Sequence, residues 1–304
     1  MDYRELLFLR AVRETGVLDA VVTDADTVDA VAEETGVTER AASIGVETLC
    51  DLGFLHRTDE GFEPTNRMLG FLSKTDLRSV GSLPHELDTL DDWIALPETM
   101  RTGDRPTPSP DATRNRLGAM AALDEGDVRA AVTAAVHEHP DADSVLDAYG
   151  GAGTFSREFA RRGYDVTLAD TDEVIEVDEP LLEHEPVTLQ ATDPIDGVDG
   201  TYDLVFCANT ARTLSPDANE RLLDALYDAV ASGGTVVHVD RLRNHAEHPG
   251  LLAAEMLART DGGDAYAEAD FGEWFAAAGF EHPRVSDVPG TRSQAVAADR
   301  PAND

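Results

Sequence analysis

The spacing of apolar residues changes along the chain and divides it into three regions. Residues 1–75 carry apolar positions three and four apart, which predict helices, and they end in two short apolar runs, 54–57 and 62–64, which predict paired strands. Residues 76–140 continue with helical spacing. Over 141–304, short apolar runs alternate with amphipathic segments, and this pattern predicts an α/β domain with a largely parallel sheet.

The first region has the pattern of a winged helix, with a helix-turn-helix followed by a hairpin. Thr27 can cap a helix that ends at Gly36, and a second helix over 38–52 follows. This second helix sets one arginine against three acids: Arg40 against Glu39, Glu47 and Asp51. Because a reader of duplex DNA needs net positive charge facing the phosphates, we expect a protein-contact domain that forms a homodimer. DNA binding is the less favoured alternative.

The middle region predicts packed helices around one loop. The prolines in 101–116 predict an exposed loop, and the apolar positions of 119–137 predict a single helix after it. His137 and His139 close that helix, and we expect them to be exposed, because a metal site would need further ligands.

The most informative stretch is Ser144–Asp170, SVLDAYGGAGTFSREFARRGYDVTLAD. A short apolar strand ends in Asp147, and after a glycine turn and an amphipathic helix a second apolar run ends in Asp170. The turn glycines are Gly150, Gly151 and Gly153. This order predicts the first half of a nucleotide-binding, Rossmann-like sheet.

The charges of this stretch favour S-adenosylmethionine over a dinucleotide. Ser156 stands where a dinucleotide motif has its third glycine, and Asp147 would repel a pyrophosphate but suits the ammonium of the methyl donor. Asp170 is placed to accept the ribose hydroxyls, and Asp193, after the predicted strand 187–189, to meet the adenine amino group. A Rossmann-like sheet that binds no nucleotide is the alternative, since one glycine motif is weak evidence.

The rest of the sheet follows from three further patterns. Strands are predicted at 202–207 and 235–239, and a terminal hairpin at 284–298. Ligands in such sheets bind beyond the carboxyl ends of the strands. Asp147, Asp170, Asp193 and the loop 208–215 are therefore expected to share one rim.

The large excess of acidic residues gives information about the salt concentration around the protein and not about its ligand. The formal net charge of the 304 residues is −36, with 60 acids against 24 basic residues, of which Lys74 is the sole lysine. Such self-repulsion becomes tolerable when salt shortens the Debye length to about 3 Å near 1 M. We expect a halophilic protein. No apolar run approaches the 20 residues of a membrane span, no signal peptide is visible, and we expect a cytoplasmic location.

With these residues placed, the chain resembles the S-adenosylmethionine-dependent O-methyltransferases of the acetylserotonin and plant small-molecule type. The segments that carry the resemblance are WIALPETMRTG, LDAYGGAGTFS and EMLARTDGGDAYAEADFGEWFAAAGF. The resemblance implies a homodimer with an N-terminal winged-helix domain, a class I methyltransferase sheet, and metal-free methyl transfer to a hydroxyl of a small cyclic or aromatic molecule. It also implies that residues 76–140 cap the substrate, with Met120 near the acceptor. The donor contacts that it implies are at Asp147, Gly151, Gly153, Asp170 and Asp193.

The chain departs from the family at two positions, one in the donor-binding stretch and one at the place of the general base. The family has glycine where this chain has Tyr149, and the position of the family's general base, a histidine, is taken by Arg212. Arginine stays protonated and cannot accept a proton, although it could orient a carboxylate. His238 on the predicted strand 235–239 is a substitute base if it faces the pocket. A catalytically silent relative that binds a ligand or partner is therefore the alternative function.

The charge excess makes one prediction about stability. Because salt screens repulsion among the acids, the midpoint of thermal unfolding should rise by several degrees between 0.2 M and 2 M KCl, which circular dichroism can follow. A midpoint that stays flat or falls over this range would refute the halophilic interpretation.

Overall fold

The structure is a computed structural model that describes four stretches of the chain: 2–23, 25–59, 61–72 and 77–302. The chain divides into two compact units, Met1–Asp91 and Asp92–Asp304. The boundary predicted at residue 75 lies outside the described residues.

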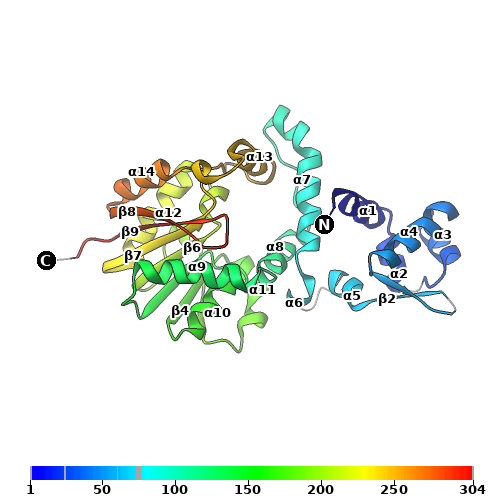
Figure 1. Ribbon diagram of the computed structural model, residues 1–304, viewed down its shortest axis with the longest axis horizontal. Helices are drawn as coiled ribbons and strands as arrows, with labels where there is room; N and C mark the ends of the chain where they lie inside the picture. The colour runs from blue at the N-terminus through cyan, green and yellow to red at the C-terminus, as the bar shows by residue number, and fades with distance from the viewer. Residues whose placement is uncertain (1, 24, 60, 73–76, 303–304) are drawn as a thin grey trace. The chain divides into compact units, whose positions relative to one another are not determined.

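The first unit is helical and carries one antiparallel hairpin (Figure 1). Its elements are α1 (Tyr3–Glu14), α2 (Val17–Thr23), α3 (Val28–Thr35), α4 (Glu39–Asp51), β1 (Leu55–Arg57), β2 (Phe62–Pro64), α5 (Asn66–Leu72) and α6 (Leu77–Val80). The Thr27 side chain caps α3 by accepting a hydrogen bond from the Ala30 amide at 3.3 Å, and Gly36 ends that helix at φ 71°. The cap and the stop signal predicted at these two positions are confirmed.

The connector differs from its prediction in one respect. Helix α7 (Leu83–Thr102) is followed by α8 (Ala112–Ala121) and α9 (Glu125–Glu138), so the single helix expected over 119–137 is two helices. The break occurs because Asp124 caps α9, accepting a hydrogen bond from the Gly126 amide at 2.7 Å. The exposed loop predicted over 101–116 is shorter than expected, because α7 ends at Thr102 and α8 begins at Ala112.

The second unit is built on a sheet that has seven strands within the described residues. They are β3 (Ser144–Ala148), β4 (Asp165–Asp170), β5 (Val187–Ala191), β6 (Tyr202–Ala208), β7 (Val230–Asp240), β8 (Glu281–Asp287) and β9 (Gln294–Asp299), in the order β5-β4-β3-β6-β7-β9-β8. The first five run parallel, and β9 pairs antiparallel with both β7 and β8. The predicted α/β class, the parallel strands and the terminal hairpin are confirmed.

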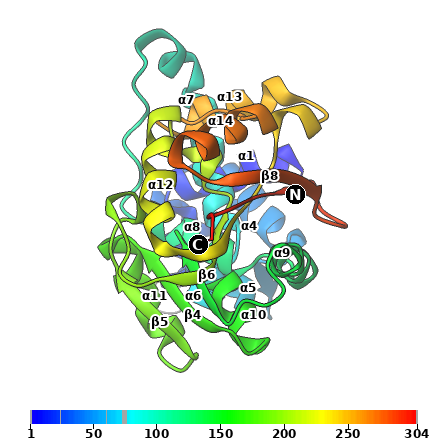
Figure 2. The same cartoon turned by 90° about the vertical axis from the view of Figure 1, so that its left-hand side faces the viewer.

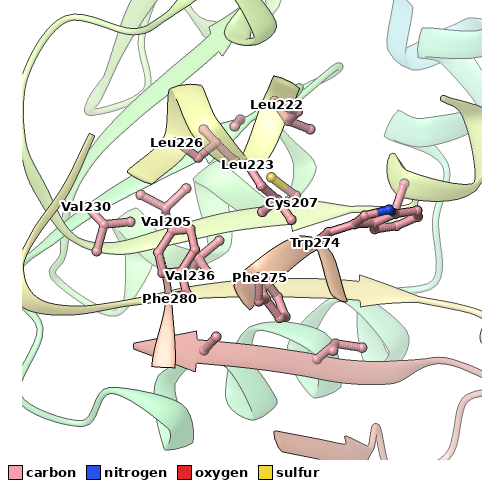
Figure 3. Close-up of a cluster of buried hydrophobic side chains, with 14 of the residues drawn as sticks. Val205, Cys207, Leu222, Leu223, Leu226, Val230, Val236, Trp274, Phe275 and Phe280 are labelled. Carbon is pink, nitrogen blue, oxygen red and sulfur yellow. The ribbon is translucent and has the colours of Figure 1, made fainter. Parts of the chain in front are cut away.

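Helices cover both faces of this sheet (Figures 1 and 2). On one face α9 and α10 (Thr154–Arg161) pack on alternate strand residues, while α12 (Pro216–Ala229) and α14 (Glu268–Ala278) cover the other. Figure 3 shows Val205 and Cys207 of β6 packed with Leu222, Leu223 and Trp274. The remaining helices are α11 (Asp172–Leu182) and α13 (Pro249–Arg259). Burial on both faces explains why the central strands read as continuous apolar runs.

Candidate functional site

Acidic side chains gather where the parallel strands end. Asp147 lies one residue before the end of β3, Asp170 and Asp240 end β4 and β7, and Asp193 follows β5 by two residues. Strand β3 pairs directly with both β4 and β6, so the ends of these strands are neighbours. The strand order reverses between β3 and β6, and in open α/β sheets the crevice at such a reversal is where ligands bind.

The glycine turn between β3 and α10 has no room for side chains. A Cβ on Gly150 would lie 2.5 Å from Cγ of Leu168, and Gly151 and Gly153 have left-handed backbones with φ of 52° and 63°. The Gly153 amide donates to the Gly150 carbonyl at 3.1 Å and closes the turn. The glycines are therefore required by the backbone path itself.

Asp147 is buried beneath this turn. Its side chain is 1% exposed, and one carboxylate oxygen accepts a hydrogen bond from Oγ of Ser156 at 2.6 Å. Burial raises the pKa of Asp147 to about 7, against the opposing effect of the Ser156 hydrogen bond, and the charge of Asp170 adds to the rise. Asp147 can therefore gain or lose its proton near neutral pH, and a cation placed beside it would favour the ionised form.

Asp170 is held by the backbone of the same turn. Its two oxygens accept hydrogen bonds from the amides of Gly151 at 3.0 Å and Thr171 at 2.8 Å. Burial raises the pKa of Asp170, while these two backbone donors act in the opposite direction. The carboxylate is thus fixed in place at the end of β4.

Tyr149 connects the glycine turn to the end of β5. Its backbone is left-handed at φ 56°, which L residues adopt only at a cost, and its amide donates to the Ala169 carbonyl at 2.8 Å. The phenol O–H donates to Asp193, which also accepts from the Ile195 amide at 3.2 Å. Burial raises the pKa of the Tyr149 phenol, so it stays a neutral donor. The ring therefore reaches from β3 to the carboxylate predicted to meet adenine.

Met120 lies against the glycine turn. A Cβ on Gly151 would be 2.3 Å from Cε of Met120, and the Met120 carbonyl accepts a hydrogen bond from Oγ1 of Thr154 at 3.0 Å. Helix α8 thus places the residue predicted to lie near the acceptor beside a residue predicted to bind the donor. Two residues predicted from separate stretches of sequence come together here.

Arg212 is fixed by two partners at the same rim. Its guanidinium forms an ion pair with Asp240, whose side chain is 3% exposed, and donates to Oδ1 of Asn209 at 2.9 Å. The Arg212 amide also donates to Asp240 at 3.3 Å. The permanent positive charge of Arg212 is therefore neutralised by a nearly buried carboxylate.

His238 does not join this group. The side chain is 2% exposed, and its ring packs edge-on against Phe271 at 5.6 Å and lies 6.2 Å from the ring of Phe275. Burial lowers the pKa of His238 to about 4, and Nε2 has no hydrogen-bond partner within the described part of the chain. Its place is in the core under α14.

Sequence reasoning missed two features of the site. Asp178 on α11 is fully buried, neither of its oxygens has a partner among the described residues, and burial together with the charge of Asp170 raises its pKa to about 8. A cavity of ≈ 420 Å³ opens beside Asn209 and Arg241, just past the ends of β6 and β7. The only sequence signal for the buried Asp178 was an aspartate inside an apolar helix face. The cavity gave no signal, because it depends on how distant segments pack.

No metal site accompanies these acids in the part of the chain that is described. There, no group of three His, Cys, Asp or Glu side chains is arranged to hold an ion. Among the same residues, no helix combines the length and apolar character needed to span a bilayer.

Comparison with known proteins gives the family. Residues 120–282 match the family described as "Methyltransferase domain". The chain is 25% identical over 291 residues to the tetracenomycin polyketide synthesis 8-O-methyl transferase TcmO of Streptomyces glaucescens, covering 87% of this chain and 84% of that protein. PigF of a Serratia species, an S-adenosyl-L-methionine-dependent methyl transferase, is 30% identical over 101 residues, which are 32% of this chain and 29% of PigF.

Solved structures agree on the fold. Human N-acetylserotonin methyltransferase in complex with SAM aligns with a TM-score of 0.67 and 20% identity, covering 99% of this chain and 94% of that one. PigF with SAH aligns with a TM-score of 0.73 and 18% identity, covering 98% and 96%. At these identities the likeness concerns the fold. The family match and the relatives confirm the resemblance to S-adenosylmethionine-dependent O-methyltransferases that the sequence indicates.

The crowding at Gly151 makes a testable prediction. Gly151→Ala should lower the free energy of unfolding by about 1–3 kcal/mol, because the new methyl meets Met120 and the backbone is left-handed. Adding Met120→Ala should recover the steric part but not the backbone part. Gly272→Ala in α14, where a Cβ meets nothing within 4 Å, is the control and should not destabilise. A Gly151→Ala protein as stable as the parent in urea unfolding would contradict this view of the turn.

A second prediction concerns the ion pair between Arg212 and Asp240. Arg212→Met should destabilise the protein by about 3 kcal/mol, because it leaves the nearly buried carboxylate of Asp240 without a counter-charge. The double variant with Asp240→Asn should recover much of the loss. Arg221→Met, at an exposed position of α12, serves as the control. Equal urea midpoints for Arg212→Met and Arg221→Met would show that the pair contributes nothing.

Proposed function

The chain belongs to the methyltransferase-domain family, and from this premise we propose that it transfers the methyl group of S-adenosylmethionine to a hydroxyl of a small cyclic or aromatic molecule. The observation that carries the proposal is the set of carboxylates at three adjacent strand ends around a glycine turn: Asp147, Asp170 and Asp193. Anions in this arrangement suit a nucleoside that carries positive charge and no phosphate. The relative TcmO, named as an 8-O-methyl transferase, supports a hydroxyl acceptor.

Each carboxylate has a distinct part in holding the donor. Asp147 pairs with the ammonium of the methionine portion, Asp170 accepts hydrogen bonds from the ribose hydroxyls, and Asp193 accepts one from the adenine amino group. The buried and easily protonated Asp147 fits this part, because its carboxylate gains a counter-charge only when a cation arrives. Tyr149 has to release Asp193, or share it, when adenine binds.

The reaction needs position more than it needs a base. S-adenosylmethionine supplies an electrophilic methyl group, and the acceptor oxygen takes it as the C–S bond breaks and the electron pair stays on sulfur. Arg212 cannot take the proton of the hydroxyl, because it is always charged and its charge is matched by Asp240. A phenol that has lost its proton to water therefore suits this site better than an alkyl alcohol. Arg212 and Asn209 act here by shaping the rim next to the acceptor.

One observation favours a second candidate function. Tyr149 occupies the position that is glycine in the family, and its phenol already holds the Asp193 carboxylate. If this hydrogen bond excludes adenine, the protein is a catalytically silent relative that binds another ligand or partner. Binding of the donor separates the two candidates directly.

We propose further that residues 1–75 form a winged-helix module through which two copies associate, and that the acidic surface is an adaptation to salt. Exposed apolar side chains on this part of the chain support association: Tyr3 is 69%, Leu7 43% and Ile44 48% exposed. Helix α4 is acidic, and Glu47 pairs with Arg57 at 3.5 Å, which leaves little positive charge for DNA. A cytoplasmic location stays a prediction from the sequence.

Donor binding should depend on pH through Asp147. Below about pH 7 the carboxyl is protonated and cannot pair with an ammonium, so the dissociation constant of S-adenosylhomocysteine should rise as pH falls from 7.5 to 5.5, by up to about tenfold per unit. The α-amino group of the ligand becomes more fully protonated as pH falls, so its own titration cannot cause the weaker binding at low pH. Isothermal titration calorimetry in 2 M KCl measures the constant.

Asp147→Asn supplies the test of mechanism. It should weaken binding at pH 7.5 more than tenfold and remove most of the pH dependence, whereas Asp165→Asn, at the exposed opposite end of β4, should change neither. Failure of the parent protein to bind donor product at any of these pH values would end the methyltransferase proposal and favour the silent relative.

A further inference from the structure

The cavity beside β6 and β7 lies next to the proposed donor site. Asn209, Val239 and Arg241 line it from the carboxyl ends of these two strands, and Phe155 lines it from the first turn of α10. Phe155 is only two residues beyond Gly153 of the glycine turn, and β6 is the direct neighbour of β3. Since neighbouring strands lie about 4.8 Å apart, the cavity begins about one strand spacing from the end of the donor-binding strand.

Most of the cavity wall is apolar. Helix α9 contributes Val128 and Ala131, and the turn between β8 and β9 contributes Val288, all three on the same side of the sheet as Phe155. Phe155 and Val288 are almost fully buried, at 5% and 1% exposed, so they form the floor more than the rim. A volume of ≈ 420 Å³ with apolar walls is in the range of small-molecule sites and would accept a fused aromatic ring system.

Two arginines face this apolar space. Arg241 follows β7 directly and is partly buried, and Arg292 lies in the exposed turn before β9. Within the part of the chain that is described, neither guanidinium has a hydrogen bond or a carboxylate within 4.0 Å. By contrast, Arg212 and Arg243 near the same strand end are both paired with acids. In a chain with 60 acids, two unpaired guanidinium groups at one cavity need an explanation.

The charges of the lining indicate which anion fits. Asp127, in the first turn of α9, is the acid of the lining, so the two arginines leave a net charge of about +1 at the cavity. A carboxylate matches that charge, while a phosphate monoester, with nearly two negative charges at neutral pH, exceeds it. The planar fork of a guanidinium also bonds both oxygens of a carboxylate at once, and this contact persists in salt better than a long-range attraction does.

We propose that this cavity binds the acceptor as an aromatic hydroxy acid, with its carboxylate on Arg241 and Arg292 and its ring against Phe155 and Val288. That the bound molecule is the methyl acceptor rests on the proposed function. Binding of an aromatic carboxylate in the cavity does not depend on it. The hydroxyl oxygen bonds to the methyl carbon, its proton leaves to water, and the C–S electron pair stays on sulfur. The carboxylate is held away from the donor and is not methylated.

Two matched probes test the carboxylate. 6-Hydroxy-2-naphthoate and 2-naphthol differ only in that group, and both fluoresce, so their dissociation constants can be measured by fluorescence titration in 1 M KCl with S-adenosylhomocysteine present. The acid should bind at least tenfold more tightly than the naphthol. Arg241→Gln and Arg292→Gln should each weaken the acid several-fold and leave the naphthol within twofold. Arg221→Gln, on α12 away from the cavity, should change neither.

The outcomes separate this inference from the proposed function. Equal affinity for the two probes, no binding of either at 1 mM, or loss of acid binding in Arg221→Gln as well would overturn the carboxylate site. So would a methyl ester product, because the carboxylate would then face the donor. Preferential binding of the acid without any methyl transfer from S-adenosylmethionine would support the site while counting against the enzyme. Circular dichroism shows whether each variant is folded, and Arg292→Gln in an exposed turn keeps the test valid if Arg241→Gln is unstable.

Discussion

Burial of acids at one end of a parallel sheet is the constraint on which the site depends. Asp147 and Asp170 are 1% and 3% exposed, and Asp178 is fully buried close enough to Asp170 to be affected by its charge. Charged carboxylates so far from water are unfavourable unless they are paired or hydrogen-bonded. The turn meets part of this cost with the Gly151 amide and with Ser156. Burial also raises the pKa values of Asp147, Asp170 and Asp178, so these carboxyl groups ionise more readily when a cation binds beside them.

The two halves of the rim handle charge differently. On the β3–β4 side, Asp147 and Asp170 are buried and accept hydrogen bonds, and Arg116 acts on Asp170 only from a distance. Asp178 has no hydrogen-bond partner among the described residues, but the charges of Arg116 and Arg157 act on it. On the β6–β7 side, Asp240 is neutralised by Arg212, and Arg241 next to it in sequence is unpaired. The positive end of a methyl donor would therefore lie on the β3–β4 side, and the negative end of an acceptor would lie on the β6–β7 side.

The sequence predicted features that depend on local patterns. The strands predicted to end at Asp147 and Cys207 are runs of apolar residues between clear turn signals, and in the structure each runs one residue further. The cap at Thr27 depends on three neighbouring residues. It did not predict α11, where Pro180 and several acids weaken the helical pattern, or α13. The break before α9 escaped notice because Asp124 acts there as a cap within an otherwise continuous periodicity. The position of the Tyr149 ring and the pairing of Arg212 with Asp240 were also unpredictable, because they join residues 44 and 28 positions apart.

The strand order of the sheet has a consequence for synthesis of the chain. Strand β9 follows β7 and β8 in the chain, but in the sheet it lies between them and contributes buried alanines to the core. Residues 241–293, which are 53 residues, separate β7 from β9. At 5–20 residues per second, the backbone groups along one side of β7 therefore wait about 3–11 s before their partners are synthesised. Such an unpaired edge invites association between nascent chains. At low ionic strength, mutual repulsion among highly acidic chains opposes such association, both in an intermediate and in the finished molecule.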